Sequence, residues 1–209
     1  QLSRAGESAS ADLVAKMDAQ LNRLTELIHD LLDVSRIEAG EIQFNEDAFD
    51  IDHLLDAVLA EITLTTDGRQ IIREGRANAR AWGDRERTGQ VLTNLLTNAI
   101  KYSPPSEAVI VHAASDGHEI TVGVQDFGVG IDAEDHLRVF DRFYRAGGPE
   151  RDTFPGLGLG LFISAEIVRR QRGRIWVESV PGEGSTFRFT LPVVSANAEP
   201  DDESAIPAV

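Results

Sequence analysis

Two asparagines and a lysine occur at helical spacing in the stretch from residue 84 to residue 103, DRERTGQVLTNLLTNAIKYS. At about 100° per residue, a helix places Asn94, Asn98 and Lys101 within an arc of roughly 60°. An amide oxygen can ligate Mg²⁺ and an ammonium group can meet phosphate, so this stripe suits a polyanion with its metal. A solvated helix face is the alternative, although Asn is a mediocre helix former and recurs here between leucines. The stretch alone leaves the two interpretations equally open.

Two glycine clusters follow, each at the end of a predicted element. The sequence VQDFGVGI predicts a strand that ends at Asp126, with Gly128 and Gly130 directly after it. The sequence GLGLGLF opens a predicted helix with Gly156, Gly158 and Gly160, where bare backbone N–H groups are suited to phosphate. A dinucleotide-binding fingerprint would need a strand before these glycines, and the preceding RAGGPERDTFP is a loop. The G-x-x-x-x-G-K-[ST] phosphate-binding loop does not occur.

The elements that must position these residues predict an α/β fold. Apolar periodicity predicts a helix from Ile51 to Ile62, and a weak strand and a loop lead on to Trp82. Two alternating segments, AVIVHAA and EITVGVQD, predict a β hairpin that turns at Ser115–Gly117. A helix-like segment is expected over 133–143. The strands RIWVESV and STFRFTLP close the unit.

A long amphipathic helix is predicted ahead of this unit, from about Ser10 or Asp12 to Ala39, with Gly40 as its stop. Its apolar residues alternate in steps of three and four: Val14, Met17, Leu21, Leu24, Ile28 and Leu31. A four-helix bundle formed by dimerisation would cover such a seam. A helix that lies along its own domain is the alternative.

The composition limits the classes of protein. A chain of 209 residues with 42% hydrophobic residues can bury a core. Its formal charge of −15 disfavours binding to nucleic acid or to an anionic membrane. The absence of cysteine excludes disulfides and thiolate chemistry. No stretch has the length and apolarity of a membrane span, and the lack of an initial methionine suggests that the native chain extends upstream.

The order of the motifs resembles the catalytic, ATP-binding domain of sensor histidine kinases. TNLLTNAIKYS is similar to the N box of that family, DFGVGI to the G1 box, FDRFYRA to the F box and GLGLGL to the G2 box. LIHDLLDVSRIEAG resembles the end of the second helix of the dimerisation and phosphotransfer domain. The gyrase B, heat-shock protein 90 and MutL branches of the superfamily lack that helix and the F box, so they are distant alternatives.

The resemblance implies a two-layer α/β sandwich preceded by a long helix of a dimeric four-helix bundle. The bundle helix would occupy residues 1–45 and the ATP-binding domain residues 46–194. Residues 195–209 are acidic and proline-bearing and are expected to be disordered. Residues 41–50 read as a turn-like connector.

The resemblance also implies a role for each matching residue, with ATP and Mg²⁺ as cofactors. Asn98 would hold the metal and Asn94 would support the same shell. Lys101 and Arg145 would face phosphate, Tyr102 would line the base or ribose, and Asp126 would accept the adenine amine. The backbone would pass close to the nucleotide at two segments: Gly128, Gly130 and Ile131, and then Gly156, Leu157, Gly158, Leu159, Gly160 and Leu161. The hydroxyl group of Thr186 would lie near the base.

Two departures from the family pattern stand out. The H box that carries the phosphate-accepting histidine does not occur, and His29 is explained better as a flank of the helix seam. Gln171-Arg172-Gly173 stands where family members often have His-Gly-Gly, a change expected to affect only a turn.

The function expected from this resemblance is that of the catalytic part of a two-component sensor histidine kinase. It would transfer the γ-phosphoryl group of ATP to a histidine upstream of Gln1, and from there to the receiver domain of a response regulator. The partners expected are a second copy, through the N-terminal helix, and that regulator. The location expected is cytoplasmic, either in a soluble protein or in the cytoplasmic part of a membrane-bound sensor. The alternative is a non-catalytic, ATP-dependent dimerisation or scaffold module.

Overall fold

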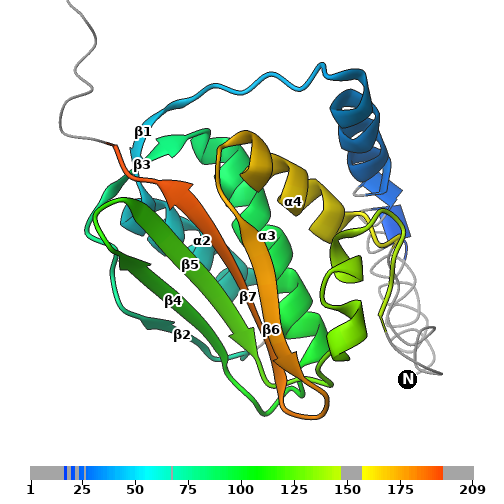
Figure 1. Ribbon diagram of the computed structural model, residues 1–209. Coiled ribbons are helices and arrows are strands. Elements are labelled where there is room, and N and C mark those ends of the chain that lie inside the picture. Colours follow the sequence, from blue (N-terminus) through cyan, green and yellow to red (C-terminus); the bar gives the residue numbers. More distant parts are fainter. Residues whose placement is uncertain are drawn as a thin grey trace, which may run out of the picture.

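A computed structural model describes residues 17, 20, 21, 24, 25, 27–66, 68–146 and 157–194 of the chain. Five strands in these ranges form one sheet in the order β2-β4-β5-β7-β6, with β2 parallel to β4 and the other neighbours antiparallel. Their bounds are β2 Ile71–Glu74, β4 Val109–Ser115, β5 Glu119–Asp126, β6 Ile175–Val180 and β7 Gly184–Pro192. Three helices lie against one face of this sheet (Figure 1): α2 Ile51–Thr65, α3 Arg85–Tyr102 and α4 Gly160–Arg170. The predicted two-layer α/β sandwich is confirmed.

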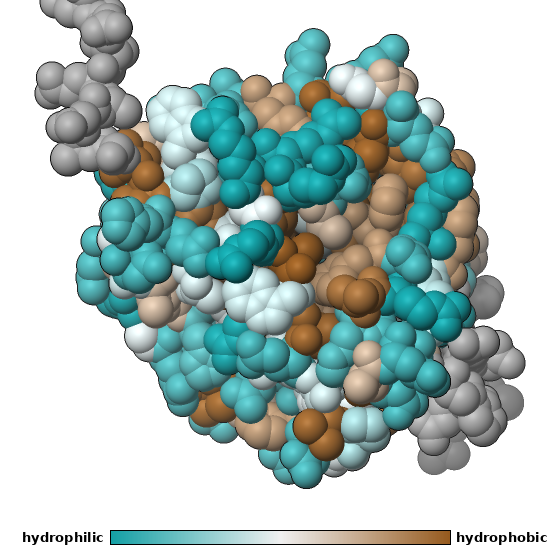
Figure 2. All heavy atoms as spheres, viewed as in Figure 1, coloured by the Kyte–Doolittle hydropathy of each residue, from teal (hydrophilic) through white to brown (hydrophobic). Residues whose placement is uncertain are grey.

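The core lies between the sheet and these helices, as the apolar patterns require. The alternating residues Ile120, Val122 and Val124 of β5 are buried, and Leu92 and Leu96 of α3 are fully buried. The other face of the sheet is more polar, because the same strands alternate. Figure 2, in the same view as Figure 1, shows polar and apolar residues intermingled over the visible surface.

The helix that carries the two asparagines begins at a strong capping residue. The Asp84 carboxylate accepts a hydrogen bond from the backbone N–H of Arg87 at 3.0 Å, which satisfies one of the free donors of the first turn. Asn94, Asn98 and Lys101 are half-buried, while the leucine face is buried. The amphipathic division predicted from the sequence is therefore present.

Two short strands and one segment differ from the expectation. Within the stretch expected to be a connector lies β1 (Asp47–Asp50), which pairs antiparallel with β3 (Arg80–Gly83) from the expected loop. The predicted helix over 133–143 is instead two 3₁₀ turns, η1 (Ala133–Asp135) and η2 (Arg138–Phe140). The backbone leaves helical geometry at Asp141, and Phe143 has a φ of 62°. Packing of Phe140 edge-on against Phe187, with ring centroids 6.3 Å apart, holds this irregular path.

The N-terminal helix is described only in part, and its beginning lies outside the described residues. It is continuous from residue 27 to Ala39, and Gly40 follows with a φ of 71°. The N–H groups of Gly40 and Glu41 reach back to the carbonyls of Ile37 and Arg36, so the predicted stop at Gly40 is confirmed. No helix in the described part of the chain is both long and apolar enough to cross a bilayer.

Candidate nucleotide-binding site

Asn94 connects α3 to the first turn of α4. Its Nδ2 donates to Ser164 Oγ at 2.9 Å, and its Oδ1 accepts from Asn98 Nδ2 at 3.4 Å. A Cβ atom at Gly160 would lie only 2.3 Å from Asn94 Oδ1, so the start of α4 approaches the amide as closely as glycine allows. Asn94 of the N box and Gly160 of the G2 box, which are 66 residues apart in the chain, therefore meet here.

Asp126 ends β5 as a buried carboxylate with only 5% of its surface exposed. Burial raises its pKa above the ordinary value, and hydrogen bonding to the backbone N–H groups of Gly128 and Ser185 opposes that rise. The bond from Gly128 N–H to Asp126 Oδ1 is 2.8 Å long. One carboxylate oxygen is thus oriented by the loop that follows the strand. The carboxylate is thereby held as a hydrogen-bond acceptor at the end of β5.

The end of α3 and the loop after β5 are fastened together. Phe127 N–H donates to Ser103 Oγ at 3.2 Å, at the residue that ends the helix. A Cβ atom at Gly128 would lie 2.4 Å from the Tyr102 carbonyl oxygen, so this contact also requires glycine. The end of the N box and the start of the G1 box are therefore in direct contact.

The rest of the G1 segment packs against the turn between β6 and β7. Ile131 N–H donates to Ser179 Oγ at 2.8 Å, and Gly130 adopts a φ of 69° against the Val180 carbonyl. The backbone of this segment is therefore held by the edge strand β6, and the Ile131 side chain packs against the core.

The F box and the G2 box are in direct contact. Phe143 N–H donates to the Gly158 carbonyl at 3.0 Å. Leu159 is buried next to the start of α4, Leu161 is half-buried and Leu157 is exposed. Gly156 and most of the preceding loop lie outside the described residues.

For the two predicted phosphate-facing cations, the structure gives a ring contact of Lys101 and the burial of Arg145. Lys101 Nζ lies 4.8 Å from the centre of the Tyr102 ring, so these two predicted residues adjoin each other. Arg145 is half-buried near the end of the F box.

The strand register separates Thr186 from Asp126. In the β5–β7 ladder, Asp126 pairs with Ser185, and Thr186 pairs with Gln125. Paired residues share a face of the sheet, so Thr186 lies on the opposite face from Asp126. Ser185 is buried beside Asp126, and its Oγ lies 2.9 Å from Ser179 Oγ. Ser185 was missed by the sequence analysis; only the pairing register distinguishes it from its neighbour.

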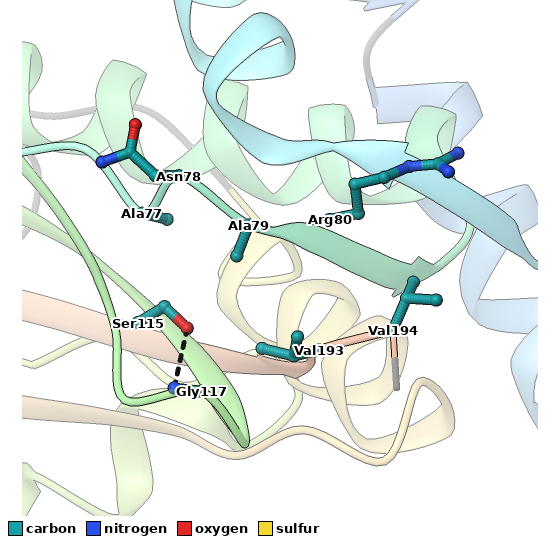
Figure 3. A pocket seen from close by; sticks show the side chains of 8 residues that line it. All are labelled: Ala77, Asn78, Ala79, Arg80, Ser115, Gly117, Val193 and Val194. Carbon is teal, nitrogen blue, oxygen red and sulfur yellow. Dashed lines mark hydrogen bonds between the residues drawn. The ribbon is translucent and has the colours of Figure 1, made fainter. Parts of the chain in front are cut away.

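A cavity of about 590 Å³ lies elsewhere, between β3, the β4–β5 turn and the end of β7 (Figure 3). It is lined by Ala77, Asn78, Ala79, Arg80, Ser115, Gly117, Val193 and Val194. None of the predicted site residues lines it.

Residues 83–195 match the model of the family described as "Histidine kinase-, DNA gyrase B-, and HSP90-like ATPase". The chain belongs to this family. It is 32% identical over 189 residues to the sensor histidine kinase WalK of Bacillus subtilis, which covers 88% of the chain. It is 34% identical over 190 residues to the sensor-like histidine kinase SenX3 of Mycobacterium tuberculosis H37Rv, which covers 90% of the chain. The chain spans 31% and 46% of the lengths of these relatives.

Solved structures of histidine kinases have the same fold. Full-length ShkA in complex with AMPPNP superimposes with a TM-score of 0.72 at 26% identity, over 83% of this chain and 36% of that chain. The mycobacterial sensor histidine kinase MprB superimposes with a TM-score of 0.63 at 25% identity, over 71% of this chain and 97% of that chain.

Proposed function

We propose that this chain is the ATP-binding catalytic part of a two-component sensor histidine kinase. The observation that carries the proposal is the convergence of three motifs. Asn94 of α3 contacts both Gly160 and Ser164 of α4. The loop after Asp126 is fastened to the end of α3 through Ser103. An acceptor for a base and a polar stripe for phosphates thereby border one region.

The residues present fit a nucleotide with its magnesium ion. Asn98 offers an amide oxygen on a half-buried face, and no cluster of three or more His, Cys, Asp or Glu occurs among the described residues. This donor set suits an ion that keeps several waters and is held largely through substrate phosphates. The ion would neutralise charge on the phosphates during transfer. Asn94 would orient Asn98, Lys101 and Arg145 would compensate phosphate charge, and Asp126 would accept the adenine amine.

The proposed partners follow from the apolar seam of the N-terminal helix. Met17, Leu21, Leu24 and Leu31 are 55–65% exposed, and Ile28 is 49% exposed. Exposure of a regular leucine-rich seam is costly in water, so we propose that a second copy covers it in a four-helix bundle. The phosphoryl group would pass from a histidine of that bundle to a response regulator, in the cytoplasm.

A scaffold module without a phosphoacceptor is the second candidate, because no H box occurs and His29 is an exposed residue of the same seam helix. Both candidates require nucleotide binding. They differ in whether the γ-phosphoryl group leaves the nucleotide for a histidine.

Phosphotransfer in trans tests the proposal. Residues 1–209 should not label themselves with γ-labelled ATP, but should label a separately supplied helical hairpin that carries the H box of the parent protein. Phosphoryl transfer depends mainly on positioning and charge compensation, so a complete donor site can act on an added acceptor. Asn98→Ala should reduce this labelling by about 10²-fold or more, and the matched control Thr97→Ala, an exposed residue of the same helix, should not. Acid-labile label on His29, or no label on the hairpin despite nucleotide binding, would contradict the kinase proposal.

A further inference from the structure

Gln171 is a buried amide at the junction between the end of α4 and the beginning of α3. It caps the C-terminus of α4, and only 2% of its surface is exposed. Its Oε1 accepts a hydrogen bond from Asp84 N–H at 2.6 Å, and the Thr88 hydroxyl lies 3.3 Å from the same oxygen. The sequence predicts that the departure at Gln171 affects only a turn, but the side chain has a larger structural role. It supplies the acceptor for a buried backbone donor at the start of another helix.

The local sequence is adapted to this contact. A Cβ atom at Gly83 would lie 2.2 Å from Gln171 Oε1, so only glycine at this position leaves room for the amide. The Gln171 Nε2 donates back to the Ile167 carbonyl of its own helix at 3.4 Å, which fixes the orientation of the amide. The side chain is thus held from both sides.

The Gln171 contact is a polar connection between α3 and α4, and the described residues provide a second one. The other is at the opposite end of α4, where Asn94 bonds Ser164 beside Gly160. The helices run antiparallel, so these two points together fix the tilt of α4 relative to α3. Gly160, the last of the G2 glycines, begins α4, and α3 carries Asn98 and Lys101. Any rotation of α4 about the Asn94 contact would move the N–H groups at the start of α4, which are proposed to bind phosphate, relative to Asn98, which is proposed to bind the metal.

We propose that Gln171 is a positioning residue for nucleotide binding: it sets the angle between α3 and α4 and so aligns the two halves of the phosphate site. This inference rests on the proposed function. Adenine binding depends on Asp126, which the sheet holds. Loss of the Gln171 contact should therefore weaken the binding of a triphosphate more than the binding of a diphosphate.

The test compares the Kd values of ADP and AMPPNP with Mg²⁺, by calorimetry, across four variants of the full chain. Gln171→Met keeps the side-chain length and removes the acceptor, and Gly83→Ala keeps the acceptor and displaces it. Gln171→His replaces the amide oxygen acceptor with a ring-nitrogen acceptor. The control Thr190→Val removes a different acceptor, on a buried residue of β7, which bonds Arg174 N–H at 3.1 Å just before β6.

The Met and Ala variants should lose about fivefold more affinity for AMPPNP than for ADP, as expected for a coupling change of ~1 kcal/mol. Gln171→His should recover most of that loss, and Thr190→Val should lower the Tm without changing the ratio of the two Kd values. If the Met and Ala variants lower the Tm but keep the wild-type ratio, Gln171 contributes stability alone and the inference is wrong. A wild-type chain that binds neither nucleotide would overturn the proposed function instead.

Discussion

Asp126 is a buried carboxyl group whose ionised form is destabilised in the folded protein. Its pKa is raised, mainly by burial, so the folded chain holds this proton to a higher pH than the unfolded chain does. Folding stability from this group is therefore complete below the ordinary pKa of 3.8 and is lost as the pH rises through the raised pKa. Above the raised pKa the ionised carboxylate could accept a hydrogen bond from a ligand, and that bond would offset part of the cost of burying the charge.

Asp126→Asn should remove this pH dependence, because an amide keeps the acceptor for Gly128 N–H and does not ionise. The free energy of unfolding of the variant minus that of wild type should be larger at neutral pH than below pH 3.8, because only wild type is destabilised when Asp126 ionises. Urea unfolding at the two pH values measures the difference. If the difference between variant and wild type is the same at both pH values, ionisation of Asp126 does not destabilise the folded protein.

The pair Ser185 and Thr186 shows where residue-level prediction from sequence ends. Both are hydroxyl residues in the same predicted strand, and the strand itself was identified correctly. A shift of one residue in the register moves a side chain to the other face of a sheet. Only the observed pairing of Asp126 with Ser185 selects the residue beside the carboxylate. The types and spacing of Asn94, Asn98 and Asp126 needed no such information, because each lies within or at the end of one strongly patterned element.

At the scale of elements, the end of α4 contains a residue in an unfavourable conformation. Arg172 has a φ of 63°, and its N–H and that of Gly173 reach back to the carbonyls of Arg169 and Val168. This is the helix-terminating position at which glycine is preferred. The ion pair of Arg172 with Glu46, at 3.6 Å, involves an exposed guanidinium and contributes little.

Arg172→Gly should therefore stabilise the fold by about 0.5–1 kcal/mol, the relief of left-handed strain less the greater entropy of unfolded glycine. The neighbouring Gly173→Ala is the opposite control, because its Cβ atom would lie 2.0 Å from the Thr190 carbonyl oxygen. Chemical denaturation of both variants gives the two free energies. A loss of stability in Arg172→Gly would show that the arginine makes a contact worth more than the strain.

The accuracy of the element predictions follows the range of the interactions. The hairpin β4–β5 and the helix α3 were predicted from local alternation and periodicity. Strands β1 and β3 were missed because each has only four residues, and their pairing, such as Phe49 with Ala81, joins segments about 30 residues apart. The segment over 133–143 has helical patterning, but the packing of Phe140 on Phe187 and the positive φ of Phe143 replace the helix by two short turns.

At the scale of the whole molecule, the N-terminal helix is fastened to the elements that hold the proposed site. Asp33 accepts from Gln90 Nε2 of α3 at 2.8 Å, and Arg170 of α4 donates to the Ile37 carbonyl at 3.1 Å. Glu38 pairs with Arg142 of the F box. Val34 and Ile37 are buried in the same core cluster as the helices of the sandwich, while the seam before them is exposed. The end of the helix therefore belongs structurally to the sandwich, and the exposed seam points to a further partner.

The central claim is that the polar stripe of α3 and the carboxylate at the end of β5 form one site for a magnesium nucleotide. Calorimetric titration of residues 1–209 with AMPPNP, with and without Mg²⁺, tests it most directly. Wild type should bind, and the loss of one charge-assisted or metal contact in Asn98→Ala or Asp126→Ala should weaken binding by at least about tenfold. The Mg²⁺ dependence should be lost in Asn98→Ala and kept in Asp126→Ala, while Thr97→Ala should match wild type. Wild-type affinity in both site variants would contradict the assignment.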